Sequence, residues 1–291
     1  MEIKKVVIPA AGWGTRFLPQ TKATPKEMLP IIDKPAIQYV VEEAVASNVK
    51  NVIIITGWQK RAIEDHFDRS LELERYLKAK GKLKELNQIK RIAKLANFIY
   101  IRQSGERYGN AMPVLASENA VGQEPFAVLW GDEFIMAKPP RLAQMIEVYK
   151  KYGGAVISAV KLESKEQVSR YGIADIEPVS QNVFRIKRVV EKPSLKEAPS
   201  RFAAHGAYIL PPQIFNIIKK LKPGKGGEIW LVDAINKLIE TKFPVYGLVI
   251  KNARYYDTGN KLEYLKTVVD FALRHPETGK EFKKYLKGLK F

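Results

Sequence analysis

The residues with the clearest chemical potential lie in one stretch near the amino terminus, where two glycines are followed by basic side chains. Gly12 and Gly14 come shortly after the apolar run 6–8, and Arg16 and Lys26 follow them. Glycine lets backbone N–H groups approach a phosphate closely, because no side chain stands in the way. The stretch is therefore typical of a cradle for a triphosphate, and an ordinary strand-to-helix turn is the alternative interpretation.

The spacing in this stretch matches neither of two common phosphate-binding fingerprints. It contains no Gly-x-Gly-x-x-Gly, and no Gly-Lys-Ser/Thr closes a P-loop. Residues 12–30 follow a longer pattern, Gly-x-Gly-Thr-Arg-x-x-Pro-x-Thr-Lys-x-x-Pro-Lys-Glu-Met-Leu-Pro. This pattern resembles the signature of the sugar-nucleotide pyrophosphorylases, and its last six positions look most like those of the bacterial-type UTP–glucose-1-phosphate uridylyltransferases. The resemblance implies transfer of a nucleotidyl group to a sugar phosphate.

The resemblance places the nucleotide on the amino-terminal stretch and on a second loop about ninety residues further along the chain. Arg16 and Lys26 would contact the triphosphate and stabilise the charge that develops on pyrophosphate, as catalytic cations. Gln103 fits the residue that reads the pyrimidine edge, since an amide offers both a donor and an acceptor. The nucleotide-binding set implied by the resemblance is Ala10, Ala11, Gly12, Gly14, Thr15, Arg16, Glu27, Gln103, Gly109 and Ala111.

Two aspartates resemble the metal-binding elements of the same family. Asp132 stands in a Gly-Asp pair after the apolar run 125–130, and Asp257 opens an Asp-x-Gly element. Magnesium prefers oxygen ligands and commonly takes one or two carboxylates together with phosphates and water. Each aspartate alone would be an ordinary turn or cap residue. Together they predict a Mg²⁺ cofactor held by Asp132 and Asp257.

Further elements resemble the sugar-phosphate side of the family's site. Glu191 and Lys192 precede Pro193, as in the family's Glu-Lys-Pro element, where the glutamate accepts bonds from sugar hydroxyls and the lysine grips the sugar phosphate. A salt-bridged strand end is the alternative for this pair. The resemblance implies sugar-phosphate contacts from Gly172, Glu191, Lys192, Gly206 and Glu228, with Lys192 also counted as catalytic.

Two positions depart from the family pattern. The base loop reads Gly109-Asn110-Ala111 where the uridylyltransferases usually have Gly-His-Ala, and Glu133 stands in place of a second aspartate after Gly-Asp. A pocket that must refuse only a methyl group discriminates by about 1–3 kcal/mol. A glucose-1-phosphate thymidylyltransferase, or an enzyme that uses both UTP and dTTP, is therefore the alternative to a UTP-specific enzyme.

Apolar runs alternate with helical patterns along most of the chain and predict the elements that position these residues. Strands are expected at 6–8, 52–56, 98–102, 125–130, 155–160, 172–176, 183–190, 203–210 and 245–250, and helices at 36–48, 59–67, 142–152, 214–221, 231–241 and 261–273. With the resemblance, this rhythm predicts an α/β protein with the three-layer α/β/α Rossmann-like nucleotidyltransferase fold and a mixed, mostly parallel sheet. Residues 1–291 would form a single domain, with a helical insertion at about 70–96 and a helical segment at about 261–291. Ligands of such sheets bind beyond the carboxyl ends of strands, where the candidate residues stand.

The composition excludes some classes of function. The chain carries a net charge of +18, concentrated in residues 76–94 and in the carboxyl-terminal tail. No nucleic-acid motif with interleaved aromatics accompanies these lysines, so a solvated basic surface is the preferred interpretation and nucleic-acid binding the lesser one. No cysteine and no long apolar run are present, and we expect a cytoplasmic protein that binds no membrane.

The expected reaction is UTP plus glucose 1-phosphate giving UDP-glucose and pyrophosphate, by in-line displacement at the α-phosphorus with Mg²⁺. The expected assembly is a homodimer or homotetramer. A non-catalytic regulatory subunit of the same fold is the alternative from another class. The retained set Arg16, Lys26, Asp132, Lys192 and Asp257 argues against it, because a scaffold does not need these side chains.

Overall fold

The computed structural model describes residues 2–290, without the side chains of residues 165 and 225. Its strands are β1 Lys5–Ala10, β2 Pro30–Ile31, β3 Lys34–Pro35, β4 Asn51–Thr56, β5 Asn97–Arg102, β6 Phe126–Leu129, β7 Glu133–Ala137, β8 Ala155–Lys161, β9 Gly172–Ser180, β10 Val183–Glu191, β11 Phe202–Leu210, β12 Val245–Val249 and β13 Ala253–Asp257. Its α-helices are α1 Ala36–Ala46, α2 Arg61–Phe67, α3 Leu71–Ala79, α4 Leu83–Ile92, α5 Ala111–Ala116, α6 Glu118–Val121, α7 Arg141–Tyr152, α8 Gln213–Lys220, α9 Leu231–Glu240, α10 Lys261–Arg274 and α11 Gly279–Gly288.

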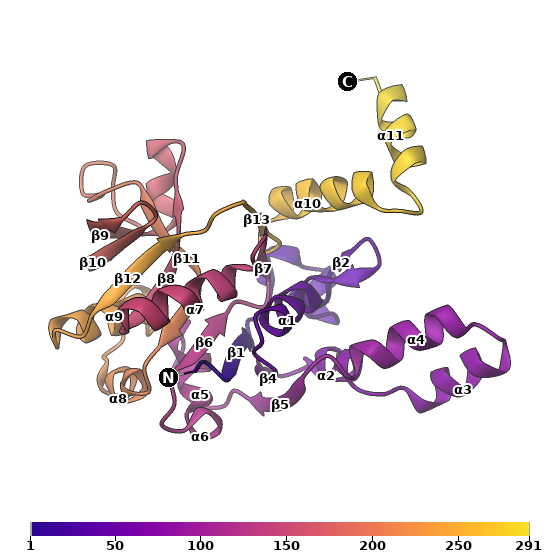
Figure 1. Cartoon of the computed structure of the whole chain (residues 1–291), viewed down its shortest axis with the longest axis horizontal. Coiled ribbons are helices and arrows are strands. Elements are labelled where there is room, and N and C mark those ends of the chain that lie inside the picture. The colour runs from indigo at the N-terminus through magenta and orange to yellow at the C-terminus, as the bar shows by residue number, and fades with distance from the viewer. Residues whose placement is uncertain (1, 291) are drawn as a thin grey trace.

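One sheet forms the centre of the molecule, with strand order β5-β4-β1-β6-β11-β8-β12-β10-β9 (Figure 1). Strands β5, β4, β1 and β6 pair in parallel, as do β8 and β12. Strand β11 is antiparallel to β6, β8 and β9, and β10 is antiparallel to β12 and β9. The sheet is mixed as predicted, but parallel pairing does not dominate it. Strands β9 and β10 are joined by a short turn, which permits only an antiparallel pair.

Hydrophobic side chains alternate between the two faces of this sheet. Val6 and Ile8 of β1 pack with α1 and α7 on one face, whereas Val7 packs with α5, α8 and α9 on the other. Both faces are buried, which explains why β1 and β4 are nearly continuous apolar runs instead of alternating patterns. The predicted three layers are therefore present, with helices on each side of the sheet (Figure 1).

The helical insertion expected at 70–96 consists of the two helices α3 and α4, joined by a turn at Gly81, whose φ is +68°. The pair extends away from the sheet beyond α2 (Figure 1). The tail expected at 261–291 forms α10 and α11, and α11 points away from the body of the molecule (Figure 1). None of the described helices is both long and apolar enough to cross a membrane.

Several elements were absent from the prediction, among them the short strands β2 and β3. Helices α5 and α6 occupy 111–121, and β7 pairs with β13 in a separate antiparallel ribbon, in which Glu133 stands opposite Asp257. Strand β13 is only five residues long and lacks the apolar alternation by which strands are recognised. This ribbon matters for function, because Asp132 and Asp257 stand at its two adjoining ends.

Candidate functional site

The glycine stretch leaves the carboxyl end of β1 and folds around Lys26. A β-carbon on Gly12 would lie 3.7 Å from Cε of Lys26. Gly14 has a φ of +68°, which favours glycine, and its carbonyl accepts a 2.7 Å hydrogen bond from the Thr21 hydroxyl. The stretch thus presents open backbone beside a lysine ammonium, as a phosphate cradle requires.

Lys26 is paired with the first candidate metal ligand. Its Nζ lies 2.5 Å from Oδ2 of Asp132. Burial alone would lower the pKa of Lys26, but the carboxylates of Asp132 and Glu27 outweigh this effect, and the pKa is raised. The lysine therefore stays charged, and an incoming triphosphate would compete with Asp132 for the ammonium.

Glu27, placed by the sequence among the nucleotide-binding residues, has a carboxyl group that is turned inward. It is 1% exposed, and its Oε2 accepts a 2.8 Å hydrogen bond from Nζ of Lys60, which is itself buried. Burial raises the pKa of Glu27, while Lys60 and Lys26 oppose the rise. The carboxylate is committed to Lys60, so Glu27 supports the base of the loop from inside the protein.

The two predicted metal ligands lie side by side. A β-carbon placed on Gly259 would lie 2.7 Å from Oδ2 of Asp132 and 3.2 Å from Oδ1 of Asp257. Thr258 joins the two segments, since its N–H and its hydroxyl both donate to the carbonyl of Asp132, at 3.0 and 2.7 Å. Arg16 reaches the same point by donating to the Gly259 carbonyl at 3.3 Å.

The charges around this pair suit a divalent cation. Burial raises the pKa of Asp257, and the nearby carboxyl groups of Glu133 and Asp132 add to the rise. Among the described residues no group of three or more His, Cys, Asp or Glu side chains could enclose an ion. Two carboxylates at a partly open position fit magnesium, which retains water and takes substrate phosphates as its other ligands.

A cleft of about 520 Å³ runs from Asp132 to the base loop. Its walls come from the glycine stretch, from the residue after β5, and from the loops before α5 and α9. The lining residues are Pro9, Ala11, Gly12, Trp13, Lys26, Glu27, Gly57, Trp58, Gln103, Gly105, Tyr108, Gly109, Asn110, Pro113, Trp130, Asp132 and Glu228. Gln103, Asp132 and Glu228, predicted for the nucleotide, the metal and the sugar, therefore line one cavity, whereas Arg16 and Asp257 are not among its lining residues.

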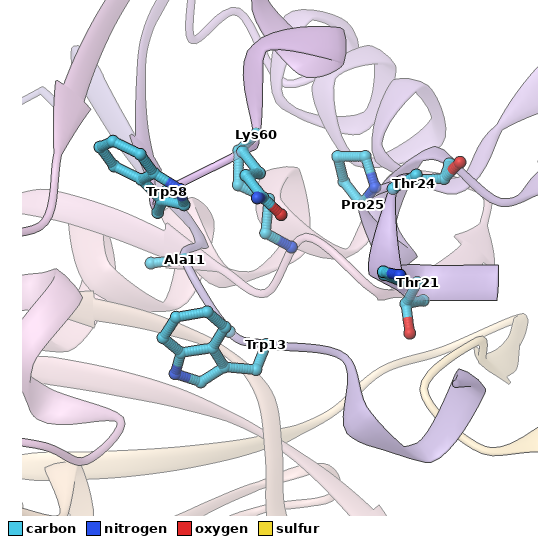
Figure 2. Close-up of a pocket in the computed structure, with 11 residues that line it drawn as sticks. Ala11, Trp13, Thr21, Thr24, Pro25, Trp58 and Lys60 are labelled. Carbon is cyan, nitrogen blue, oxygen red and sulfur yellow. The ribbon is translucent and has the colours of Figure 1, made fainter. Parts of the chain in front are cut away.

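A smaller pocket adjoins this cleft. Figure 2 shows Trp13 and Trp58 on one side of it, Thr21 and Pro25 on the other, and Lys60 between them. Both indoles also line the large cleft, and they are 71% and 68% exposed. Two exposed aromatic rings at the mouth of a cavity offer a surface on which a ligand can pack.

The base loop is only partly as predicted. Gln103 lines the cleft, and its N–H is fixed by a 2.8 Å bond to the Thr56 carbonyl. Gly109 also lines the cleft. Ala111, however, is fully buried, and its N–H donates to the Ile229 carbonyl at 3.1 Å. Ala111 therefore anchors the loop, and its backbone N–H is not available to the nucleotide.

The sugar-side residues stand at the end of β10 and beside it. Gly172 is buried against Glu191, whose Oε2 would lie 3.0 Å from a β-carbon on Gly172. Lys192 has a φ of +46°, an uncommon conformation for a residue with a side chain, and its Nζ lies 3.6 Å from Oε1 of Glu191. Glu228 lines the cleft. Gly172, Glu191 and Lys192 are not among the residues that line this cleft, so their sugar-phosphate role stays a prediction.

The family model described as "Nucleotidyl transferase" matches residues 5–272. The chain belongs to this nucleotidyl transferase family. It is 46% identical, over 99% of its own length and 96% of the relative's, to UTP–glucose-1-phosphate uridylyltransferase YngB of Bacillus subtilis (strain 168). Two solved structures are similar along their whole length. The UTP-bound UGPase from Acinetobacter baumannii has a TM-score of 0.90 and 36% identity, covering 99% of this chain and 100% of the other. A UDP-glucose pyrophosphorylase complexed with UDP-glucose has a TM-score of 0.84 and 39% identity, covering 94% and 100%.

One predicted sugar contact of this nucleotidyl transferase, Gly206, lies against buried side chains. Gly206, with a φ of +84°, is not among the residues that line the cleft, and it packs against Arg141 and Glu133. A β-carbon there would lie 2.5 Å from both Nη1 of Arg141 and Oε1 of Glu133. The glycine is needed because a buried polar network approaches the backbone at this point, which gives it a packing role.

That network was not found from the sequence of the nucleotidyl transferase. Tyr255 donates to Oε2 of Glu133 at 2.9 Å, and Nδ1 of His205 lies 3.3 Å from the same oxygen. Arg141 is bound to Glu43 through two 2.9 Å hydrogen bonds. These groups come from distant parts of the chain, and their spacing in sequence carries no signal. The network contacts the segments that carry the two aspartates, because Glu133 is adjacent to Asp132 in the sequence and opposite Asp257 in the ribbon.

Proposed function

We propose that the protein transfers a uridylyl group from UTP to glucose 1-phosphate and releases pyrophosphate. The observation that carries this proposal is that Lys26, Asp132 and Gln103 line one cleft, with Asp257 beside Asp132. It is supported by the names of relatives that align over nearly the whole chain, and by similar structures that bind UTP and UDP-glucose.

The chemistry needs alignment and charge stabilisation more than covalent help from the protein. Asp132 and Asp257 would hold Mg²⁺, which when bound neutralises charge on the triphosphate. Lys26 is paired with Asp132, and Arg16 donates to the Gly259 carbonyl beside the same aspartates, so both cations would stabilise the charge that grows on the departing pyrophosphate.

The attacking group would come from the side of β10 and α9. Lys192 offers an ammonium to the sugar phosphate, and Glu191 and Glu228 offer acceptors for sugar hydroxyls. At the far end, the Gln103 amide would read the pyrimidine edge. Hydrogen bonds from this amide would not distinguish uracil from thymine, which differ by a methyl group. The comparison of UTP with dTTP is therefore part of the test.

The test is a panel of nucleoside triphosphates against several hexose 1-phosphates, followed by pyrophosphate release and identification of the product. We expect the highest kcat/KM with UTP and glucose 1-phosphate, loss of activity with EDTA, and recovery with Mg²⁺. A clearly higher kcat/KM with dTTP would replace the proposal by a thymidylyltransferase. No pyrophosphate with any pair would favour a non-catalytic role, and a salt-sensitive gel shift would then test nucleic-acid binding.

Two substitutions test the proposed roles of individual residues. Asp257→Ala and Lys192→Ala should each reduce turnover by orders of magnitude while the fold is retained. Asp65→Ala and Lys187→Ala are matched controls, because both side chains are exposed members of surface ion pairs and should leave turnover unchanged. Near-normal turnover in either test variant would remove that residue from the mechanism.

We infer a homodimer or homotetramer from an apolar row on α10. Leu262, Leu265, Val269 and Leu273 follow helical spacing and are 59%, 59%, 37% and 38% exposed. A second copy of the chain would cover this row. Light scattering coupled to size exclusion should give a multiple of the 33.0 kDa chain mass, and Leu265→Glu should reduce it. A monomeric wild-type protein would contradict the inference. The expected cytoplasmic location stays a prediction, which cell fractionation would test.

A further inference from the structure

The ammonium group of Lys192 is held over an aromatic ring. Its Nζ lies 4.9 Å from the ring centre of Trp230, and the lysine side chain is still 42% exposed. A lysine has a flexible four-carbon stem and three rotatable donors, so an unsupported ammonium samples many positions. Tryptophan is the strongest cation–π partner among the aromatic side chains. The indole therefore restricts where the charge of Lys192 can lie.

The backbone on both sides of Trp230 is fixed to the base loop. Leu231 N–H, at the start of α9, donates to Oδ1 of Asn110 at 2.7 Å. Ile229 N–H donates to the Tyr108 carbonyl, also at 2.7 Å. The ring that carries Lys192 is thus attached to the loop that lines the nucleotide end of the cleft.

The contact between the two segments has no spare room. A β-carbon on Gly109, whose φ is +123°, would lie 2.2 Å from the carbonyl oxygen of Ile229. Ala111 N–H completes the junction by donating to that same oxygen at 3.1 Å. A segment held at this many points can place an aromatic ring at a defined position.

We propose that Trp230 is a positioning residue that orients the Lys192 ammonium toward the phosphate of the sugar substrate. The inference rests on the proposed function, in which Lys192 contacts glucose 1-phosphate. Trp230 acts through Lys192, so its replacement should weaken the sugar phosphate subsite and leave the UTP subsite intact. A merely structural role for Trp230 would disturb both substrates together.

The test compares Trp230→Leu, Trp230→Phe and wild type by steady-state kinetics with each substrate varied in turn. Trp230→Leu should raise the KM for glucose 1-phosphate roughly two- to fivefold, the size expected for an exposed cation–π pair. The KM for UTP should not change. Trp230→Phe keeps a ring face with weaker attraction and should fall between the other two.

A matched control is available in Tyr152, over whose ring Nζ of Lys151 lies at 5.0 Å, away from the cleft. Tyr152→Leu removes a similar contact and should leave both KM values unchanged. An inactive wild-type protein would overturn the proposed function and this inference with it. If the wild type is active, an unchanged KM for glucose 1-phosphate in Trp230→Leu would overturn this inference alone. Equal rises in both KM values, or a phenylalanine variant no better than the leucine variant, would do the same.

Discussion

Replacing Glu133 by glutamine should change how the stability of the protein depends on pH. The carboxyl group is buried, and its Oε2 accepts the hydrogen bond from Tyr255. Burial raises the pKa of Glu133 from 4.5 to about 7, with the Arg141 guanidinium opposing the rise and Asp132 adding to it. Glutamine has nearly the same shape and keeps an acceptor for Tyr255, but it does not titrate.

The sign follows from proton binding. Between pH 4.5 and about 7, the folded protein holds a proton on Glu133 that the unfolded chain has already released. The unfolded state then binds fewer protons, so this group lowers the free energy of unfolding as pH rises through the window. Each pKa unit corresponds to about 1.4 kcal/mol, and the whole shift to roughly 3 kcal/mol.

The Glu133→Gln variant should therefore match the wild type near pH 4.5 and become more stable than it by roughly 3 kcal/mol above pH 7. The difference between variant and wild type is the useful quantity, because other groups titrate in the same range. Burial lowers the pKa of His205 from 6.5 to about 4, which makes stability rise with pH between those values. Because Nδ1 of His205 lies 3.3 Å from Oε2 of Glu133, the two groups are coupled, and the same comparison is therefore also made in a His205→Gln background, where this opposite slope is absent.

Urea denaturation at several pH values, with EDTA to exclude divalent ions, measures this difference. Glu147→Gln is the control, because Glu147 is an exposed glutamate on α7 paired with Lys150, and it should show no pH-dependent difference from wild type. A difference between Glu133→Gln and wild type that stays constant from pH 4.5 to above pH 7 would refute the assignment of a raised pKa to Glu133.

Three further substitutions and measurements test the structure directly. Lys60→Met leaves the 1% exposed Glu27 without the Lys60 ammonium and should lower the free energy of unfolding by about 3–5 kcal/mol. Adding Glu27→Gln to this variant should recover most of the loss. A Lys60→Met protein as stable as wild type would contradict the inference that Lys60 and Glu27 form a buried ion pair. Gly109→Ala should destabilise the protein more than Gly105→Ala, because both residues have a positive φ but only at Gly109 would the new β-carbon clash with the backbone of Ile229. Equal losses of stability would mean that the backbone strain of a positive φ, and not this clash, determines the cost. Because one sheet runs through the molecule, we infer a single cooperative domain and expect one unfolding transition by calorimetry. Two separated transitions would argue for two domains.

The parts of the fold that could be predicted are those in which a local pattern decides the structure. Strand β4 is a run of β-branched residues buried on both faces, and α1 has an apolar face at helical spacing. Both were expected within two residues of their observed bounds. The ribbon of β7 and β13 was missed, because β13 is short and is stabilised by its partner strand instead of by its own pattern.

The candidate site shows the same division. The family pattern located the glycine stretch, Asp132 and Asp257, and the rule that ligands bind beyond strand ends anticipated that they would meet. Lys60 was missed, because a lysine in a sequence carries no sign of the buried glutamate it will pair with. Gly206 stays a predicted sugar contact, but the Arg141 and Glu133 side chains, which leave no room for a β-carbon there, give a reason for the glycine that the sequence does not show.

Asn110 illustrates why a departure from a family pattern must be interpreted in three dimensions. In the sequence it stands where the uridylyltransferases usually have histidine, which suggests a change in base selection. In the structure its Oδ1 is bound to the Leu231 N–H, 121 residues away. The side chain therefore links the base loop to the segment that carries Trp230, and through it Lys192. A substitution at Asn110 is therefore expected to shift Trp230 and Lys192 and to weaken binding of the sugar phosphate. A changed substrate preference in such a variant would not by itself show that Asn110 contacts the base.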